Sequence, residues 1–492
     1  MGDFNVVALR VEFQADTTRF TTGNGRFDGD PFMGLDPSVD PLPHDDQFFQ
    51  AHLDALAHYV EHVSDGRASV TTALLPQVVQ VSGEMADYTP VGLDATSDEE
   101  ISKLAALIEE AWTIAAGNSE IRLDHLDPER TFFVLFHAGV GRDIELVGTT
   151  LEKTPLDLPS IFFNRSRLQA LGVPPLVVGG LEVANTAVIP RTETRVGFDF
   201  FADRFFLAEL TTNGLIASSF LNFLGLPDLF DTESGESAIG PFGLMDPLGI
   251  FAYGGLIPPE PSPWSKAFLG WAHPIDIVPG VDADLRLAAV STPDSSEMVR
   301  VWVSETEYFI VENRHRDLAG DGLRLLARRG DVETEQRVAN GDSLFNNRNI
   351  EGFSGGVLVA VDDYDWSLPG GLDEDGNPLL GGALLWHVDE TLIAQRIGRN
   401  AVNASPGSRG VDVEEADSGQ DLGTRSTGII GPQLELGSPF DFFFAGNPVT
   451  AITPSGRAVA LYANRFGDDT FPNSRTNGGG PSFVSIQDFS AP

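Results

Sequence analysis

Apolar residues in the first half of the chain follow both strand and helix periods. The runs at residues 5–13 (NVVALRVEF) and 131–137 (TFFVLFH) are β-branched or apolar throughout, which predicts buried strands. Residues 160–164 resemble an edge strand. Between the first two runs, residues 45–63 carry one apolar stripe at spacings of three and four. Its members are Phe49, Leu53, Leu56, Val60 and Val63. The pattern therefore predicts an amphipathic helix between two buried strands.

Three further helices are expected in this half. One begins near Asp98, because Ser97 and Glu100 have the spacing of a capping box. Residues 205–226 are helical in character, although Asn213-Gly214 interrupts them and Pro227 ends them. Residues 264–271 (WSKAFLGW) form a short amphipathic pattern.

The pattern changes after about residue 275. Short apolar runs separated by turn residues predict strands, and with 492 residues two domains are expected. These runs are 285–290, 298–303, 308–311, 357–361, 383–388 and 458–462. We expect an α+β domain at residues 1–275 and a β-rich, sandwich-like domain at residues 276–492.

Composition excludes several classes of partner and chemistry. The formal charge is −41, from 72 acidic and 31 basic residues, so the field of the whole protein repels nucleic acid and anionic membranes. The absence of cysteine excludes disulfides, thiol catalysis and thiolate metal sites. No apolar run reaches the length of a membrane span. The first residues read as the start of a strand and not as a signal peptide, so any export signal is expected to be absent from this chain.

The segment at residues 213–231 (NGLIASSFLNFLGLPDLFD) has the frame of a zinc-protease helix. In such a helix two histidines lie four residues apart on one face. A glutamate between them acts as the general base for zinc-bound water. A glycine then turns the chain toward a third ligand. Here the glycine and the following Leu-Pro-Asp are present, whereas the histidines and the glutamate are absent.

Several separated motifs resemble the immune inhibitor A family of secreted bacterial metallopeptidases. They occur in the same order over most of the chain, and together they are far more specific than any one of them. They are the opening strand with TTGNGRFDG (21–29), GLPDLFD (225–231), GPFGLMD (240–246), WSKAFLGW (264–271), EYFIVENR (307–314), LLWHVDE (384–390) and GVDVEEAD (410–417). The resemblance implies a metzincin-like protease domain, a twisted sheet plus helices, followed by an all-β domain.

The family pattern places histidine at 218 and 222 and glutamate at 219, where this chain has Ser218, Ser219 and Asn222. Asp228 matches the third ligand, and Met245 matches the methionine turn beneath the metal. Hydroxyl and amide oxygens are weak zinc ligands, so we expect no zinc and no intact catalytic residue. The bulk of Leu221 and Phe223 predicts a partly filled pocket.

Other histidines and serines offer weaker candidates. His58, Glu61 and His62 spell the inverted zinc motif H-x-x-E-H, but both histidines fall opposite the apolar stripe of their helix. His137 and His387 are expected to be hydrogen-bonded structural residues. A serine nucleophile at 218 or 219 lacks the G-x-S-x-G frame and a nearby base.

Calcium is the cofactor that the acidic loops could hold, since hard cations take carboxylate and carbonyl oxygens. One candidate loop comprises Asp373, Asp375 and Asn377 around a turn glycine, without the distal glutamate of an EF-hand. A second set comprises Asp389, Glu390, Asn403, Glu415, Asp417 and Asp421. The alternative is a solvated acidic surface.

Two functions from different classes fit these observations. The first is a catalytically inactive metallopeptidase homologue, a pseudopeptidase with a structural, assembly or binding role outside the cell or at its surface. Its partners would be proteins, peptides or further copies of itself. The second is an active secreted zinc metalloprotease with non-standard ligands. A carbohydrate-binding role for the β-rich half rests on fold analogy alone.

Overall fold

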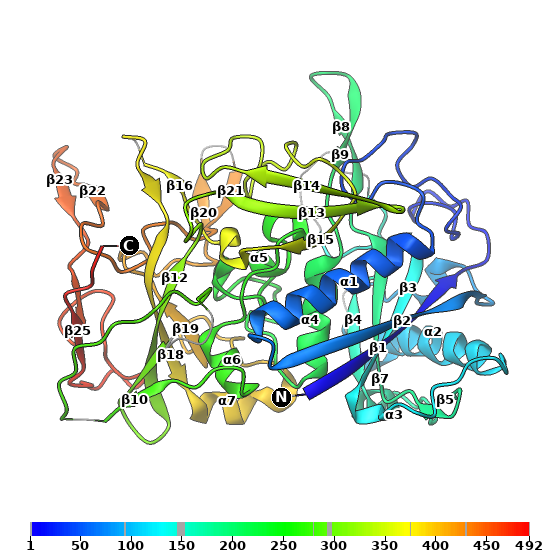
Figure 1. Cartoon of the computed structure of the whole chain (residues 1–492), viewed down its shortest axis with the longest axis horizontal. Helices are drawn as coiled ribbons and strands as arrows, with labels where there is room; N and C mark the ends of the chain where they lie inside the picture. Colours follow the sequence, from blue (N-terminus) through cyan, green and yellow to red (C-terminus); the bar gives the residue numbers. More distant parts are fainter. Residues whose placement is uncertain are drawn as a thin grey trace.

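A five-stranded sheet organises the first half of the chain (Figure 1). The computed structural model describes residues 2–92, 95–144, 153–278, 280–292, 298–373, 375–428 and 431–491. The strand order is β2-β1-β3-β7-β4, in which β4 at the edge is antiparallel and the other neighbours are parallel. The strands are β1 (Gly2–Glu12), β2 (Ala68–Gln80), β3 (Thr131–Val140), β4 (Ile161–Asn164) and β7 (Asn185–Thr192). The predicted buried strands and edge strand are thereby confirmed.

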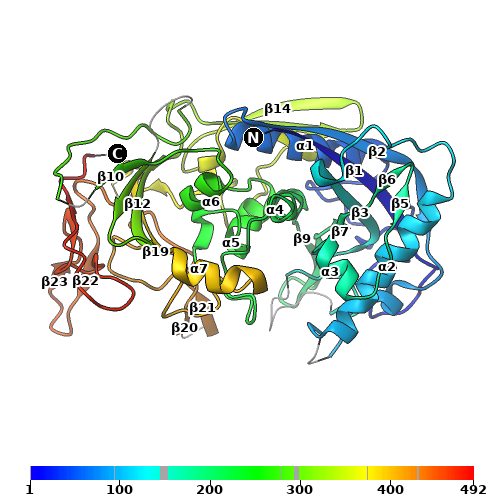
Figure 2. The same ribbon diagram turned by 90° about the horizontal axis from the view of Figure 1, so that it is seen from below.

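Helices cover both faces of this sheet (Figure 2). Along β1, Val6 and Ala8 face one apolar cluster and Val7 and Leu9 face another, as the strand period requires. The first cluster contains α1 (Asp46–Val63) and α4 (Asn213–Phe223), and the second contains α2 (Asp98–Ala116). Every residue of the predicted stripe on α1 is buried.

Local capping explains where the first two helices begin. The Asp45 side chain accepts hydrogen bonds from the backbone N–H groups of Gln47 and Phe48 at the start of α1. Ser97 caps α2 through the N–H of Glu100. The Glu100 carboxylate accepts the N–H of Val91 instead of returning to Ser97, so only half of the predicted capping box forms.

Two sheets of three or more strands lie in the described part of the second half, together with four two-stranded sheets. One has the order β10-β11-β12-β18-β19, and the other has the order β14-β13-β15. Their strands are β10 (Ile275–Ile277), β11 (Met298–Trp302), β12 (Glu307–His315), β13 (Leu323–Arg329), β14 (Val332–Val338), β15 (Val357–Val361), β18 (Gly381–Asp389) and β19 (Val411–Glu414). The helix α7 (Glu390–Arg396) follows β18, so this half is rich in strands without being all-β.

The two halves share one core. The largest apolar cluster joins α1 and α4 to residues of β12, β13, β15 and β18. At this junction the Asn213 side-chain amide donates to the Leu358 carbonyl of β15 at 2.8 Å. The three-stranded sheet therefore packs on α1 of the first half. In the described residues we find a mixed α+β architecture in which apolar packing continues across residue 275.

Two sequence-based elements are wrong in part. Residues 205–212 do not extend α4, because β9 (Arg204–Ala208) pairs in an antiparallel hairpin with β8 (Arg195–Asp199). Residues 285–290 form no strand, and their one ladder contact is an isolated bridge between Ala289 and Asn313. Residues 264–271 do contain the predicted helix, α6 (Pro263–Phe268). Across the described part of the chain, every helix is too short or too polar to traverse a bilayer.

Candidate functional site

The segment that resembles a zinc-protease helix in sequence is α4, and its first residues are fixed by close packing. A Cβ atom on Gly214 would lie 1.9 Å from the Ile250 carbonyl oxygen, so only glycine allows this approach of backbone to helix. The Asn213 side-chain oxygen lies 2.7 Å from Nδ1 of the buried His52 on α1. Asn213-Gly214 thus begins the helix and does not interrupt one.

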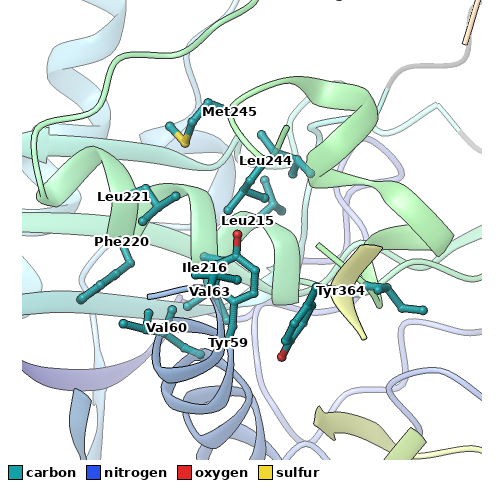
Figure 3. Close-up of a cluster of buried hydrophobic side chains, with 14 of the residues drawn as sticks. Tyr59, Val60, Val63, Leu215, Ile216, Phe220, Leu221, Leu244, Met245 and Tyr364 are labelled. Atoms are coloured by element: carbon teal, nitrogen blue, oxygen red, sulfur yellow. The ribbon is translucent and has the colours of Figure 1, made fainter. Parts of the chain in front are cut away.

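The two serines at the expected ligand and base positions are buried. Ser218 and Ser219 are 5% and 6% exposed, and Ser218 donates its hydroxyl to the Leu215 carbonyl within the same helix at 3.1 Å. Leu221 is fully buried among apolar side chains, as Figure 3 shows. Phe223 packs on the sheet residues Phe4 and Phe132. The neighbourhood of the serines is therefore largely apolar.

Asp228, which the resemblance aligns with a third zinc ligand, is held by two side-chain amides. Asn222 donates to Asp228 Oδ1 at 3.3 Å and also to the Leu226 carbonyl at 3.0 Å. Asn400, from the second half, donates to Asp228 Oδ2 at 2.7 Å and accepts the Asp228 backbone N–H at 2.8 Å. We call Asn222, Asp228 and Asn400 the amide clasp. Burial raises the pKa of Asp228, and the two amide hydrogen bonds partly oppose that shift.

Asn400 was not identified from sequence. It adopts φ 53°, the left-handed region in which asparagine is favoured among residues with side chains, and it ends a short turn after α7. Asn403 reinforces the same connection by donating to the carbonyls of Leu229 and Val411. An asparagine after a helix was the sequence signal for the turn, but no local pattern indicated its partner.

Met245, the residue that the resemblance aligns with a methionine turn, is buried against this segment. Met245 is 1% exposed, and its carbonyl accepts the Leu229 N–H at 2.7 Å. The neighbouring Asp246 carboxylate accepts N–H groups of Ala238, Ile239 and Leu248. Burial nevertheless raises the pKa of Asp246 to about 6. These bonds hold the turn through its backbone, without any need for an ion.

Few of the groups that zinc-dependent hydrolysis requires are present at this position. Positions 218, 219 and 222 supply hydroxyl and amide groups, and the Asp228 carboxylate is committed to the clasp. The cavity beside α4, between α1 and β15, is about 10 Å³, roughly the size of one water molecule, and Asn213 and Ala217 line it, not the serines or Asp228. The donor set does not fit zinc and lacks a general base.

His58, in the H-x-x-E-H motif on α1, is exposed, as its position opposite the apolar stripe predicts. His62 is less exposed than expected: its ring packs against Tyr364, and its Nε2 lies 4.0 Å from Glu260 Oε1. The buried polar residue of this helix is His52, whose Nε2 lies 3.5 Å from Asp40 Oδ1. Burial lowers the pKa of His52 to about 4, so the ring is neutral near pH 7.

His137 and His387 are both buried and hydrogen-bonded, as expected for structural residues. The His137 ring accepts the Gly139 N–H at 3.1 Å, and burial lowers its pKa to about 3. His387 lies between Glu307, at 2.8 Å, and Glu414, at 3.4 Å. Burial opposes the charged ring, but these two carboxylates outweigh it and raise the His387 pKa to about 9.

The first calcium loop is closed by its own hydrogen bonds. Asp373 accepts the N–H groups of Asp375 and Asn377 and the Asn377 side-chain amide. These bonds lower the pKa of the exposed Asp373 carboxyl. The loop joins two short antiparallel strands, and its carboxylate serves the turn.

The second acidic set separates into distinct places. Asp389 caps α7, Glu390 accepts from Tyr308 and Trp264, and Asn403 joins the loop behind the clasp. Glu415 and Asp417 instead meet Asp441, a residue that sequence reasoning missed. Their carboxylate oxygens lie within 4.8 Å of one another, and we call these three residues the acidic cluster.

Backbone groups hold the acidic cluster in place. The N–H groups of Asp421 and Leu422 donate to Glu415, and Ser438 donates to Asp441. Burial and the neighbouring negative charges raise the pKa values of both Glu415 and Asp441. Asp421 therefore contributes its backbone N–H to the cluster.

Comparisons with known proteins add no relative to these observations. The scan against protein-family models gave no match, and the search of curated proteins gave no similar protein.

Proposed function

We propose that the chain is a catalytically inactive homologue of the immune inhibitor A metallopeptidases, with a structural, assembly or binding role outside the cell. The motif order supports the relationship. The residues of α4 support the loss of chemistry, because both helix imidazoles and the general base are replaced by Ser218, Asn222 and Ser219.

The amide clasp is the observation that carries this proposal. A zinc site would need the Asp228 carboxylate free to meet a cation, together with nitrogen ligands from α4. Here both carboxylate oxygens accept amide protons, and one donor comes from a loop 172 residues further along the chain. Asp228 thus stays at the position of a third ligand, but its carboxylate joins two parts of the fold.

The surface charge indicates which partners a binding role would involve. The net charge of −41 disfavours nucleic acid, so a protein or peptide partner, or another copy of the chain, suits the surface better. The retained methionine turn and α6 mean that any such role depends on the intact fold and not on turnover.

The test is zinc content together with peptidase activity in the purified full chain. We expect less than one-tenth of a zinc ion per chain after incubation with zinc sulfate, and no cleavage of denatured casein that a chelator abolishes. The control is Asp228→Asn, which should bind and cleave no differently. One zinc ion per chain with chelator-sensitive cleavage, both lost in Asp228→Asn, would establish an active protease with non-standard ligands.

A further inference from the structure

Three neighbouring parallel strands end at a group of buried ionisable side chains that the proposed function does not use. Glu193 directly follows β7, Asp143 lies just after β3, and the loop after β1 supplies Thr22. Asp157 lies in the segment that leads to β4. The carboxyl ends of parallel strands are the usual place for ligands in open sheets of this kind.

Asp157 and Glu193 are equally buried but differ in their partners. Both are 0% exposed. Asp157 accepts the Thr22 N–H and hydroxyl at 2.7 Å each, accepts the Thr154 hydroxyl, and lies 3.5 Å from Arg195 Nη2. Neither oxygen of Glu193 meets a hydrogen-bond donor from the described residues. A buried carboxylate without a donor is costly, so Glu193 needs a proton or a cation that none of the described hydrogen-bond donors supplies.

The Glu193 carboxylate lies against a second acid. A Cβ atom on Gly141 would lie 1.4 Å from Glu193 Oε1, so glycine leaves the space that the carboxylate occupies. The Glu193 carboxyl also contacts that of Asp143, whose two oxygens both face the Ser160 N–H at 2.9 and 3.0 Å. Two carboxyl groups in contact require either a shared proton or a cation between them.

With Asp143, Asp157 and Glu193 all ionised, three negative charges face the one positive charge of Arg195, a difference of two. Burial and the neighbouring Asp143 raise the pKa of Glu193, so its ionised form needs a compensating positive charge. Arg195 directs its hydrogen bonds to the Thr154 hydroxyl and the Gly141 carbonyl, beside Asp157, and makes none to Glu193. One divalent cation would balance the remaining pair.

We propose that Glu193 and Asp143 bind a divalent cation of the calcium class at the carboxyl ends of β3 and β7. The ligands are oxygens only, which suits a hard cation and not zinc. Asp157 and Arg195 hold the loop behind the ion as a paired, hydrogen-bonded support. This inference is independent of the pseudopeptidase proposal.

The experiment counts calcium ions bound to the full chain by equilibrium dialysis after removal of divalent cations with a chelator. We expect Glu193→Gln to bind one calcium ion fewer per chain than the wild type. Glu99→Gln makes the same charge change at an exposed position on α2 and should bind as the wild type does. Glu415→Gln identifies any ion held by the acidic cluster, and it should keep the ion that depends on Glu193.

The melting temperature distinguishes a bound cation from a shared proton between Glu193 and Asp143. Calcium chloride should raise the melting temperature of the wild type by several degrees, and this Glu193-dependent increment should be absent in Glu193→Gln. Asp143→Asn provides the same test at a half-buried position, should Glu193→Gln fail to fold. Equal calcium stoichiometry in the wild type, Glu193→Gln and Asp143→Asn would overturn the proposal and leave the shared proton as the explanation.

Discussion

Two regions of the molecule place carboxylates in the interior by opposite means. In the amide clasp, Asp228 stands alone and receives protons from the side chains of Asn222 and Asn400. In the acidic cluster, Glu415 and Asp441 lie close together with Asp417 and receive only backbone and serine donors. The first arrangement is complete within the protein, whereas the second leaves like charges facing one another.

This difference indicates which carboxylates have a physical reason to bind a cation. A carboxylate whose two oxygens each accept an amide hydrogen bond, as in Asp228, is stabilised without an ion. Crowded carboxylates are stabilised by protons or by a hard cation. Of the calcium ligands predicted in the second half, only Glu415 and Asp417 therefore stay candidates, now together with Asp441.

The largest expected effect comes from rebuilding the zinc ligands. Ser218→His, Ser219→Glu and Asn222→His together should destabilise the protein by roughly 3–5 kcal/mol, because large polar groups enter an apolar, closely packed region. Urea unfolding measures the loss, and we expect no peptidase activity. The matched control changes the same three residues to alanine and should cost less. Robust zinc-dependent turnover in the rebuilt variant would contradict the view that the region around Asp228 is complete without an ion, because only the missing ligands would then have prevented zinc binding.

The pH dependence of stability should distinguish the acidic cluster. Because its folded-state pKa is raised above the ordinary 4.5, Glu415 contributes stability that is fully present below about pH 4.5 and is lost as the pH rises toward the folded pKa. The loss should be on the order of 2 kcal/mol between pH 5 and 7. Urea unfolding across this range should show a shallower decline for Glu415→Gln. Identical slopes for the two proteins would contradict the crowding that we describe.

The amide clasp should give an effect of similar size. Asn400→Gly removes the side-chain amide while tolerating the positive φ, and should cost roughly 2 kcal/mol because the Asp228 carboxylate loses a charged hydrogen bond. A double-mutant cycle with Asp228→Ala measures the coupling. Additive effects of the two changes would show that the clasp contributes little to stability.

The smallest effect is expected at the exposed calcium-like loop. Asp373→Ser should barely change stability in urea unfolding, because its hydrogen bonds are local bonds in a solvent-exposed turn. Calcium binding measured by dialysis should be unchanged, because this carboxylate closes its own loop. Loss of a bound calcium ion in Asp373→Ser would return this loop to the set of cation sites.

Sequence patterns predicted the elements whose causes are local. The stripe on α1 and the apolar runs of β1 and β3 depend on periodicity and burial, and both were correct. Residues 205–212 were misread as helix because their apolar character does not reveal the hairpin partner, β8. The run at 285–290 has strand composition, but in the structure it makes only an isolated bridge.

The candidate site was predictable only as far as its motif extends. Ser218, Ser219, Asn222 and Asp228 could be assigned by position along the chain. Asn400 and Asp441 could not, because each meets its partners through long-range folding and neither lies in a motif with a known spacing. Glu193 could not be predicted for a related reason. Its importance lies in its burial without a hydrogen-bond donor, whereas the neighbouring Asp157 has several, and only the folded structure shows this difference.

The separation of Asn400 from Asp228 also bears on the order of folding. Contacts between residues 172 positions apart form late, because a long loop must close first. During synthesis α4 emerges well before Asn400, so Asp228 initially has only the nearby Asn222 amide. The second half then supplies the missing donor as it docks. We therefore expect the clasp to form only when the second half docks, and hydrogen exchange at the Asp228 N–H, which Asn400 accepts, would report when the two halves have joined.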